Sequence, residues 1–186
     1  MNVMLDLETF GTTPGCAIRS IGAVTFALEG DHAEQSFSVN IDTHSCLYAR
    51  LHIEQGTHEW WKQQSAEARA ALQIDARPLS AVVAEFETWC KRQSSMNDLK
   101  IWAQGSNFDP VLWKAAAKAV GRGVSWKFYN CRDTRTLYEL AGFDPRSVAR
   151  VGVYHSALDD ARHQVRCCRE AYKKLKNSMR VSDLET

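Results

Sequence analysis

The sequence predicts an α/β fold in which a central mixed β-sheet, beginning with an antiparallel three-strand meander, is flanked by helices. Two observations support this prediction. Three short segments rich in β-branched and aromatic residues occupy the first 42 residues, with turn-forming residues between them. In the rest of the chain, apolar residues recur mainly at helical spacing, and one short strand-like segment interrupts them.

The meander is expected from residues 2–8, 17–28 and 36–42. The first segment is apolar but carries two acids, as a buried strand does when its end reaches a functional site. Gly30 and Asp31 close the hairpin between the second and third segments. The sequence therefore predicts three adjacent antiparallel strands.

The remaining elements are expected to be helices around one strand. Ser80 is the predicted N-cap of the second helix, and the last helix is the longest, with apolar side chains on one face. The expected ranges are helices over residues 54–73, 79–93, 108–120, 133–141 and 156–176, and a strand over 100–104. We expect residues 1–178 to form a single domain, followed by a polar tail at 179–186.

Composition narrows the functional classes. Of the 186 residues, 45% are hydrophobic and 24% charged, which indicates one globular domain rather than a disordered chain. Apolar runs are too short to span a bilayer, and the N-terminus lacks the basic region of a secretory signal, so we expect a cytoplasmic protein. The net charge of +1 gives no overall attraction to nucleic acid, although local metal ions can bind phosphates instead. The six cysteines form no Cys-x-x-Cys pair and are expected to be free thiols.

Asp6 and Glu8 lie two residues apart on the first predicted strand. Side chains at this spacing point to the same face, so both carboxylates project together. Like charges held this close repel one another unless a cation bridges them. The alternative is a solvated strand edge, which the apolar neighbours argue against. The pair is therefore a candidate set of metal ligands.

Asp109 lies at the start of a predicted helix, immediately before Pro110, which is an ordinary N-cap arrangement. Ser106 can cap this helix instead, with Asp109 three residues later as the acid of a capping box and one carboxylate oxygen facing outward. The sequence leaves open whether Asp109 is a cap or a ligand.

His155 and Asp160 lie at the start of the last predicted helix. We expect His155 in the loop before it and Ser156 as its cap. Asp160 falls on the flank of the apolar face, whereas Asp159 points to a different side as a solvated acid. Asp160 is thus the better metal ligand. His155, taken alone, is also compatible with a surface loop.

The four carboxylates and the histidine together suit phosphodiester hydrolysis. Two divalent ions can hold the attacking and leaving oxygens of an in-line displacement, and Mg²⁺ and Mn²⁺ prefer hard oxygen ligands. A neutral histidine, with an ordinary pKa of about 6.5, can accept the proton of the attacking water. The sequence therefore predicts a metal-dependent enzyme acting on phosphodiesters.

The chain resembles the DnaQ-like 3′–5′ exonucleases of the DEDDh subgroup, in the ribonuclease H-like superfamily. Three motifs carry the resemblance, in the right order and over most of the chain: Asp6-Leu-Glu-Thr9, Asn107-Phe-Asp109 and His155-x-x-x-x-Asp160. The run Leu158-Asp-Asp-Ala-Arg162 and the pair Trp60-Trp61 look most similar to a compact branch. That branch includes exonuclease VIII-like proteins and a mycobacterial exoribonuclease-like domain.

The resemblance implies a ribonuclease H-like fold and an exonuclease that releases nucleoside 5′-monophosphates from the 3′ ends of single-stranded or frayed DNA or RNA. By motif position, Asp6, Glu8, Asp109 and Asp160 would bind two Mg²⁺ or Mn²⁺ ions. His155 would be the general base. Thr9 and Phe10 would line the pocket for the terminal nucleotide, although Phe10 is equally suited to fill the core below the turn.

Further residues are candidates for substrate binding. Trp60 and Trp61 face different ways on a helix, so one can be core and the other a stacking surface, and we take Trp61 as the binding residue. Asn107 can orient a metal ligand or the substrate. Arg132 can contact a phosphate, or it can be a solvated residue at the start of a helix.

Two other functions remain open at this stage: an endonuclease for RNA or hybrids on the same fold, and a non-catalytic module that binds nucleic acid. The complete acidic set argues against the second. The sequence decides neither between DNA and RNA nor between a monomer and a homodimer.

Overall fold

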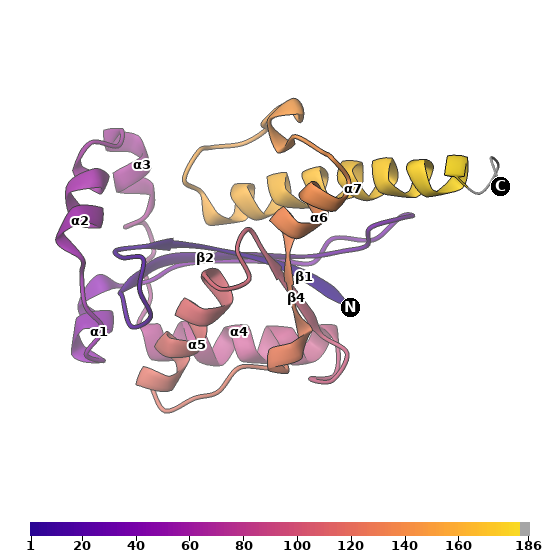
Figure 1. Cartoon of the computed structure of the whole chain (residues 1–186). Coiled ribbons are helices and arrows are strands. Elements are labelled where there is room, and N and C mark those ends of the chain that lie inside the picture. The colour runs from indigo at the N-terminus through magenta and orange to yellow at the C-terminus, as the bar shows by residue number, and fades with distance from the viewer. Residues whose placement is uncertain (183–186) are drawn as a thin grey trace.

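A computed structural model describes residues 1–182, and the side chains of all of these except 68 and 180–182. Its centre is a five-stranded sheet in the order β3-β2-β1-β4-β5 (Figure 1). The strands are β1 (Asn2–Thr9), β2 (Ile18–Phe26), β3 (Ser36–Asn40), β4 (Lys100–Ala103) and β5 (Cys131–Asp133). β1, β2 and β3 pair antiparallel, whereas β4 and β5 extend the sheet in parallel. The predicted mixed sheet with an antiparallel meander is confirmed.

Helices cover both faces of this sheet. Figure 1 shows α7 and α6 on one face and α4 and α5 on the other. The helices are α1 (Thr43–Tyr48), α2 (Gln55–Lys62), α3 (Ala66–Ala71), α4 (Leu79–Gln93), α5 (Asp109–Ala119), α6 (Thr134–Leu140) and α7 (Ala157–Ser182), with short 3₁₀ turns η1 (Phe128–Asn130) and η2 (Pro145–Ser147). Among the described residues, no helix combines the length and the apolar character needed to cross a membrane.

Alternate side chains of β1 serve the two faces, as the pleat of a strand requires. Val3, Leu5 and Leu7 belong to the core cluster shared with α4 and α5. Met4 belongs to the second cluster, shared with α6 and α7. Asp6 and Glu8 lie two and four residues after Met4. The two acids of β1 therefore project from the same face of the strand as Met4, toward α7.

Gly22 allows α7 to approach the sheet closely. It lies opposite Asp6 in the β1–β2 pairing. A Cβ at this position would overlap the backbone of Ala157 and Leu158, where α7 begins. The missing side chain thus sets how near the start of α7 lies to the acids of β1.

Several predicted boundaries differ from the structure. The expected helix over residues 54–73 is two helices, because the amides of Gln63 and Gln64 bond three residues back and close α2. Helix α1 and strand β5 were not expected, and both are too short to show a clear period. α7 continues past residue 176 to Ser182, through a segment free of Gly and Pro. Part of the predicted tail is therefore helical, and residues 183–186 lie outside the described residues.

Two predicted caps are wrong. α4 begins one residue before Ser80, and the amide of Leu79 donates to Oγ of Ser45 in α1 at 2.9 Å, so the cap comes from another helix. The amide of Ser106 donates to Asp133 at 2.8 Å, and no side chain caps α5. The prediction of free thiols is confirmed for all six cysteines.

Candidate active site

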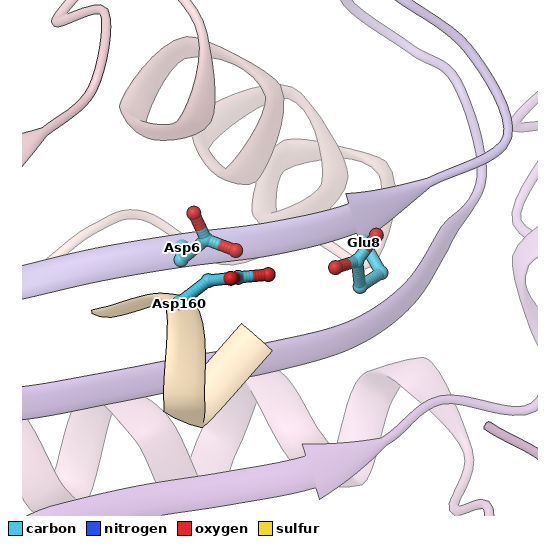
Figure 2. A group of neighbouring side chains, drawn as sticks. All are labelled: Asp6, Glu8 and Asp160. Carbon is cyan, nitrogen blue, oxygen red and sulfur yellow. The ribbon is translucent and has the colours of Figure 1, made fainter. Parts of the chain in front are cut away.

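Three carboxylates meet where the end of β1 faces the start of α7. Asp6, Glu8 and Asp160 each offer an oxygen, and these atoms lie within 4.8 Å of one another (Figure 2). Asp6 and Glu8 project from the same face of β1, and Asp160 reaches them from the first turn of α7. The structure thus brings together the predicted first and third motifs.

Asp109 approaches the cluster from the start of α5, the helix on the sheet face opposite α7. Its side chain is buried at the start of α5, and its Oδ1 accepts a hydrogen bond from the amide of Leu7 at 3.1 Å. The carboxylate therefore fastens α5 to the middle of the Asp6–Glu8 segment, and it lines a pocket together with Asp6. The sequence left open whether Asp109 caps this helix. Its hydrogen bond joins α5 to β1 instead, and no side chain caps the helix.

The electrostatics of the cluster favour a bound cation. Burial raises the pKa of Glu8 to about 7 and that of Asp109 to about 7. Burial raises the pKa of Asp6 well above its ordinary value, and the charges of Asp109 and Glu8 raise it further. Buried carboxylates this close are costly as anions unless a cation compensates them. A donor set made only of carboxylate oxygens fits hard divalent ions such as Mg²⁺ or Mn²⁺.

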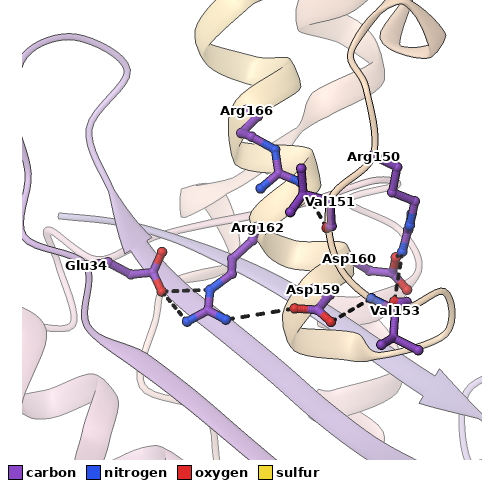
Figure 3. A network of polar contacts seen from close by, with 8 residues as sticks. All are labelled: Glu34, Arg150, Val151, Val153, Asp159, Asp160, Arg162 and Arg166. Atoms are coloured by element: carbon purple, nitrogen blue, oxygen red, sulfur yellow. Dashed lines mark hydrogen bonds and ion pairs between the residues drawn. The ribbon is translucent and has the colours of Figure 1, made fainter.

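The polar neighbours of the acids, among them Gln164 and Arg150, were not identified from the sequence. Gln164, one turn after Asp160 on α7, is buried and donates from Nε2 to Oδ1 of Asp6 at 2.6 Å. Arg150 forms an ion pair with Asp160 (Figure 3). Its guanidinium carbon also lies 4.2 Å from the ring centre of Tyr154. The spacing of Gln164 from Asp160 is a signal that sequence reasoning could have used. Arg150 sits in an irregular loop and gives no such signal.

Asp159 points away from the cluster, as predicted, but it is not a purely solvated acid. Its Oδ2 accepts from the amide of Val153 at 2.9 Å, and its Oδ1 lies 3.9 Å from Arg162 (Figure 3). Arg162 also donates to Glu34. Asp159 therefore holds the loop before α7 against the helix.

His155 lies in that loop, as predicted, with a left-handed φ of 61°. This conformation is costly for a residue other than glycine and marks a position fixed by its surroundings. Its ring packs edge-on against Trp60 and Trp61, with centroid distances of 5.1 and 5.8 Å. Burial, and then the charge of Arg150, lower the pKa of His155. The imidazole is thus neutral near pH 7 and can accept a proton.

The position of Trp61 corrects the expectation that it offers a stacking surface. Trp61 is only 2% exposed, and its Nε1 donates to the carbonyl of Thr9 at 2.8 Å. Trp60 is the exposed member of the pair, at 42%. Trp61 is therefore a buried residue that holds the end of β1 through this hydrogen bond. The accessible ring beside His155 is that of Trp60.

Of the other predicted binding residues, Asn107 lines the pocket that contains the acids, and Arg132 does not. The hydroxyl of Thr9 donates to the carbonyl of Gly11 at 2.7 Å, and Phe10 is buried under the guanidinium of Arg19. Asn107 is exposed and lines the pocket that contains Asp6 and Asp109. Arg132 donates to the carbonyls of Tyr129 and Cys131 at 2.9 Å each and does not line that pocket.

Comparison with known proteins decides the family. The sequence model of the 3′–5′ exoribonuclease Rv2179c-like domain matches residues 1–172. The chain belongs to this family. The predicted enzyme class, a 3′–5′ exonuclease, is confirmed by this membership. No curated protein matches the chain.

Solved structures share the fold at low identity. E. coli exonuclease I in a complex with single-stranded DNA is 14% identical, with a TM-score of 0.58, over 95% of this chain and 40% of that one. A product-bound exonuclease I is 15% identical, with a TM-score of 0.57, over 98% and 45%. The nuclease domain of 3′hExo, a DEDDh member bound to rAMP, is 13% identical, with a TM-score of 0.55, over 92% and 91%. The chain thus spans less than half of the exonuclease I chains but nearly all of the 3′hExo domain, and the ribonuclease H-like fold is confirmed.

Proposed function

We propose that this protein removes nucleoside 5′-monophosphates from the 3′ end of single-stranded or frayed RNA, using Mg²⁺ or Mn²⁺. The observation that carries the proposal is the group of three carboxylates within 4.8 Å, which come from the first and third of the motifs that carry the sequence resemblance. RNA is favoured over DNA because the matched family is described as exoribonuclease and the match covers residues 1–172. The likeness to exonuclease I concerns the fold alone.

Asp6, Glu8, Asp109 and Asp160 would hold two divalent ions. Such ions supply positive charge to the phosphate under attack and to the leaving oxygen. Two hydrogen bonds within the chain position the carboxylates for this role. The Leu7–Asp109 hydrogen bond fixes α5 against β1, and Gln164 orients the carboxylate of Asp6.

His155 is assigned as the general base. Its pKa is lowered by burial, so the ring is neutral at neutral pH and able to take the proton of the attacking water. Trp60 and Trp61 restrict the ring from one side, and the left-handed backbone fixes its point of attachment. Removing the imidazole should lower kcat by about 10²- to 10⁴-fold.

A 5′-labelled RNA oligonucleotide incubated with Mn²⁺ tests the proposal. We expect stepwise shortening from the 3′ end, loss of activity in Asp160→Asn, and unchanged activity in Glu170→Gln, an exposed acid on the same helix. His155→Ala should lose the rate but keep Mn²⁺ binding in calorimetry. Activity retained in Asp160→Asn would refute the site.

Substrate form is tested with matched molecules. A circular single strand should remain uncut, and cleavage of it would indicate an endonuclease instead. A DNA oligonucleotide of the same sequence should be cut more slowly than the RNA. Equal rates would show that the site does not distinguish the 2′-hydroxyl.

A further inference from the structure

A groove beside the active site is lined by aromatic and apolar side chains from two segments. One wall is formed by α5, with Pro110, Val111 and Lys114. The other wall is the segment before β5, including Trp126, Phe128 and Tyr129. The cavity measures about 450 Å³, within the size range of ligand pockets. None of the residues assigned to catalysis lines it.

Phe128 and Tyr129 present their rings to solvent. They are 82% and 58% exposed, and their ring centroids lie 5.2 Å apart in an edge-to-face arrangement. Two adjacent exposed aromatic side chains are unfavourable in water unless something covers them. They therefore indicate a surface that binds a partner.

The short turn η1 that carries these rings is firmly held. The side chain of Asn130 is buried and donates to the carbonyl of Asn97 at 2.7 Å, and Trp126 is buried on the other side of the pair. Arg132 donates to the carbonyl of Tyr129 at 2.9 Å. The rings thus project from a fixed backbone, which lowers the entropy lost when a ligand stacks on them.

The groove adjoins the pocket of the active site. Asn107 lines both the groove and the pocket that contains Asp6 and Asp109. A strand whose terminal phosphodiester lies at the acids can therefore pass Asn107 and continue along α5. Among the described residues that line the groove, Lys114 is charged and none is acidic, which suits a polyanion.

We infer that this groove binds the nucleotides upstream of the one being removed, with bases stacked on Phe128 and Tyr129 and a phosphate near Lys114. The inference rests on the proposed function, because that function places the 3′ end at the acids. Stacking on aromatic side chains and contact with a lysine suit single-stranded RNA of any sequence. A protein partner or a second copy of the chain would not need the connection to the active site.

The test compares substrates with and without an upstream strand. One substrate is an RNA octamer, and the other is a p-nitrophenyl ester of a nucleoside 5′-monophosphate. Phe128→Ala/Tyr129→Ala should raise KM for the octamer about tenfold or more, at about five- to 150-fold per stacked base, and leave the ester unaffected. Tyr48→Ala, which removes a ring that is 94% exposed on α1, is the matched control and should leave both unchanged.

Direct binding separates this inference from the proposed function. Fluorescence anisotropy of a labelled octamer with Asp160→Asn needs no cleavage, and the aromatic substitutions should weaken binding in that background as well. Lys114→Gln should reduce the slope of log Kd against log salt by about 0.7, whereas Lys118→Gln on the same helix should not. If the wild-type protein binds the octamer through these rings but cleaves no substrate, the groove is an RNA-binding site and the proposed activity is refuted.

Three results would overturn the inference. The first is octamer affinity unchanged by the aromatic substitutions. The second is an equal loss on octamer and ester, which would indicate a structural effect on the active site. The third is a wild-type dimer that the substitutions dissociate in analytical ultracentrifugation without weakening RNA binding, which would make the groove an interface between copies.

Discussion

With a chelator present, the carboxylate cluster should make the protein less stable as the pH rises from about 5 to about 8. Burial raises the pKa of Glu8 from 4.5 to about 7. A carboxyl with a higher pKa in the folded state contributes stability that is fully present below 4.5 and is lost as the pH rises through about 7. The shift corresponds to about 3 kcal/mol, at about 1.4 kcal/mol for each pKa unit.

Urea denaturation in EDTA at several pH values measures this effect. The informative quantity is the difference in the free energy of unfolding between wild type and Glu8→Gln, because all other side chains are the same in the two proteins. We expect Glu8→Gln to gain about 2.5 kcal/mol relative to wild type between pH 5 and pH 8, since part of the effect develops below pH 5. Glu170→Gln, an exposed acid on α7, should follow the wild type throughout.

Mn²⁺ should reverse the trend, since it binds the ionised carboxylates and only in the folded state. Its stabilisation of the wild type should be larger at pH 8 than at pH 5. Parallel pH profiles for wild type and Glu8→Gln in EDTA would refute the reasoning, because they would mean that Glu8 is as easily ionised in the folded protein as in the unfolded one.

Three further substitutions test how the site is supported. Gly22→Ala should displace the start of α7 and abolish RNA cleavage, measured beside Gly56→Ala, where a Cβ meets no atom within 4 Å. Trp61→Phe should lower the free energy of unfolding in urea by about 1 kcal/mol, because the strand carbonyl that accepts its indole N–H loses a buried partner; unchanged stability would contradict this. Arg150→Gln should tighten Mn²⁺ binding in calorimetry by up to about fivefold, since the arginine competes for Asp160, and weaker binding would show that it aids the metal instead.

The sequence predicted best those features that depend on a local period. The two-residue spacing of Asp6 and Glu8 places both on the face of β1 toward α7, as the structure confirms. Helical spacing selected Asp160 over Asp159 in the same way. The order of the motifs then indicated the family, which covers residues 1–172.

Features that depend on contacts between distant segments were not predictable in this way. The bond from Leu7 to Asp109 joins residues far apart in the chain, and local rules left open whether this acid is a helix cap or a metal ligand. Strand β5 has three residues, too few to show alternation. Gly22 lies within a fully buried strand, and only the packed start of α7 explains why a side chain is excluded there.

The residues that offset the buried acids explain why the motifs alone describe the site incompletely. Arg19 lies against the rings of Phe10 and Trp61 and lowers the pKa of Glu8, opposing the larger effect of burial. Gln164 and Arg150 act in the same direction on Asp6. The chain thus brings partial compensation from β2, α7 and the loop before it, yet the pKa of Glu8 still rises to about 7. These neighbours offset only part of the cost of burying the carboxylate charges. Divalent ions bound between the carboxylates can offset the rest.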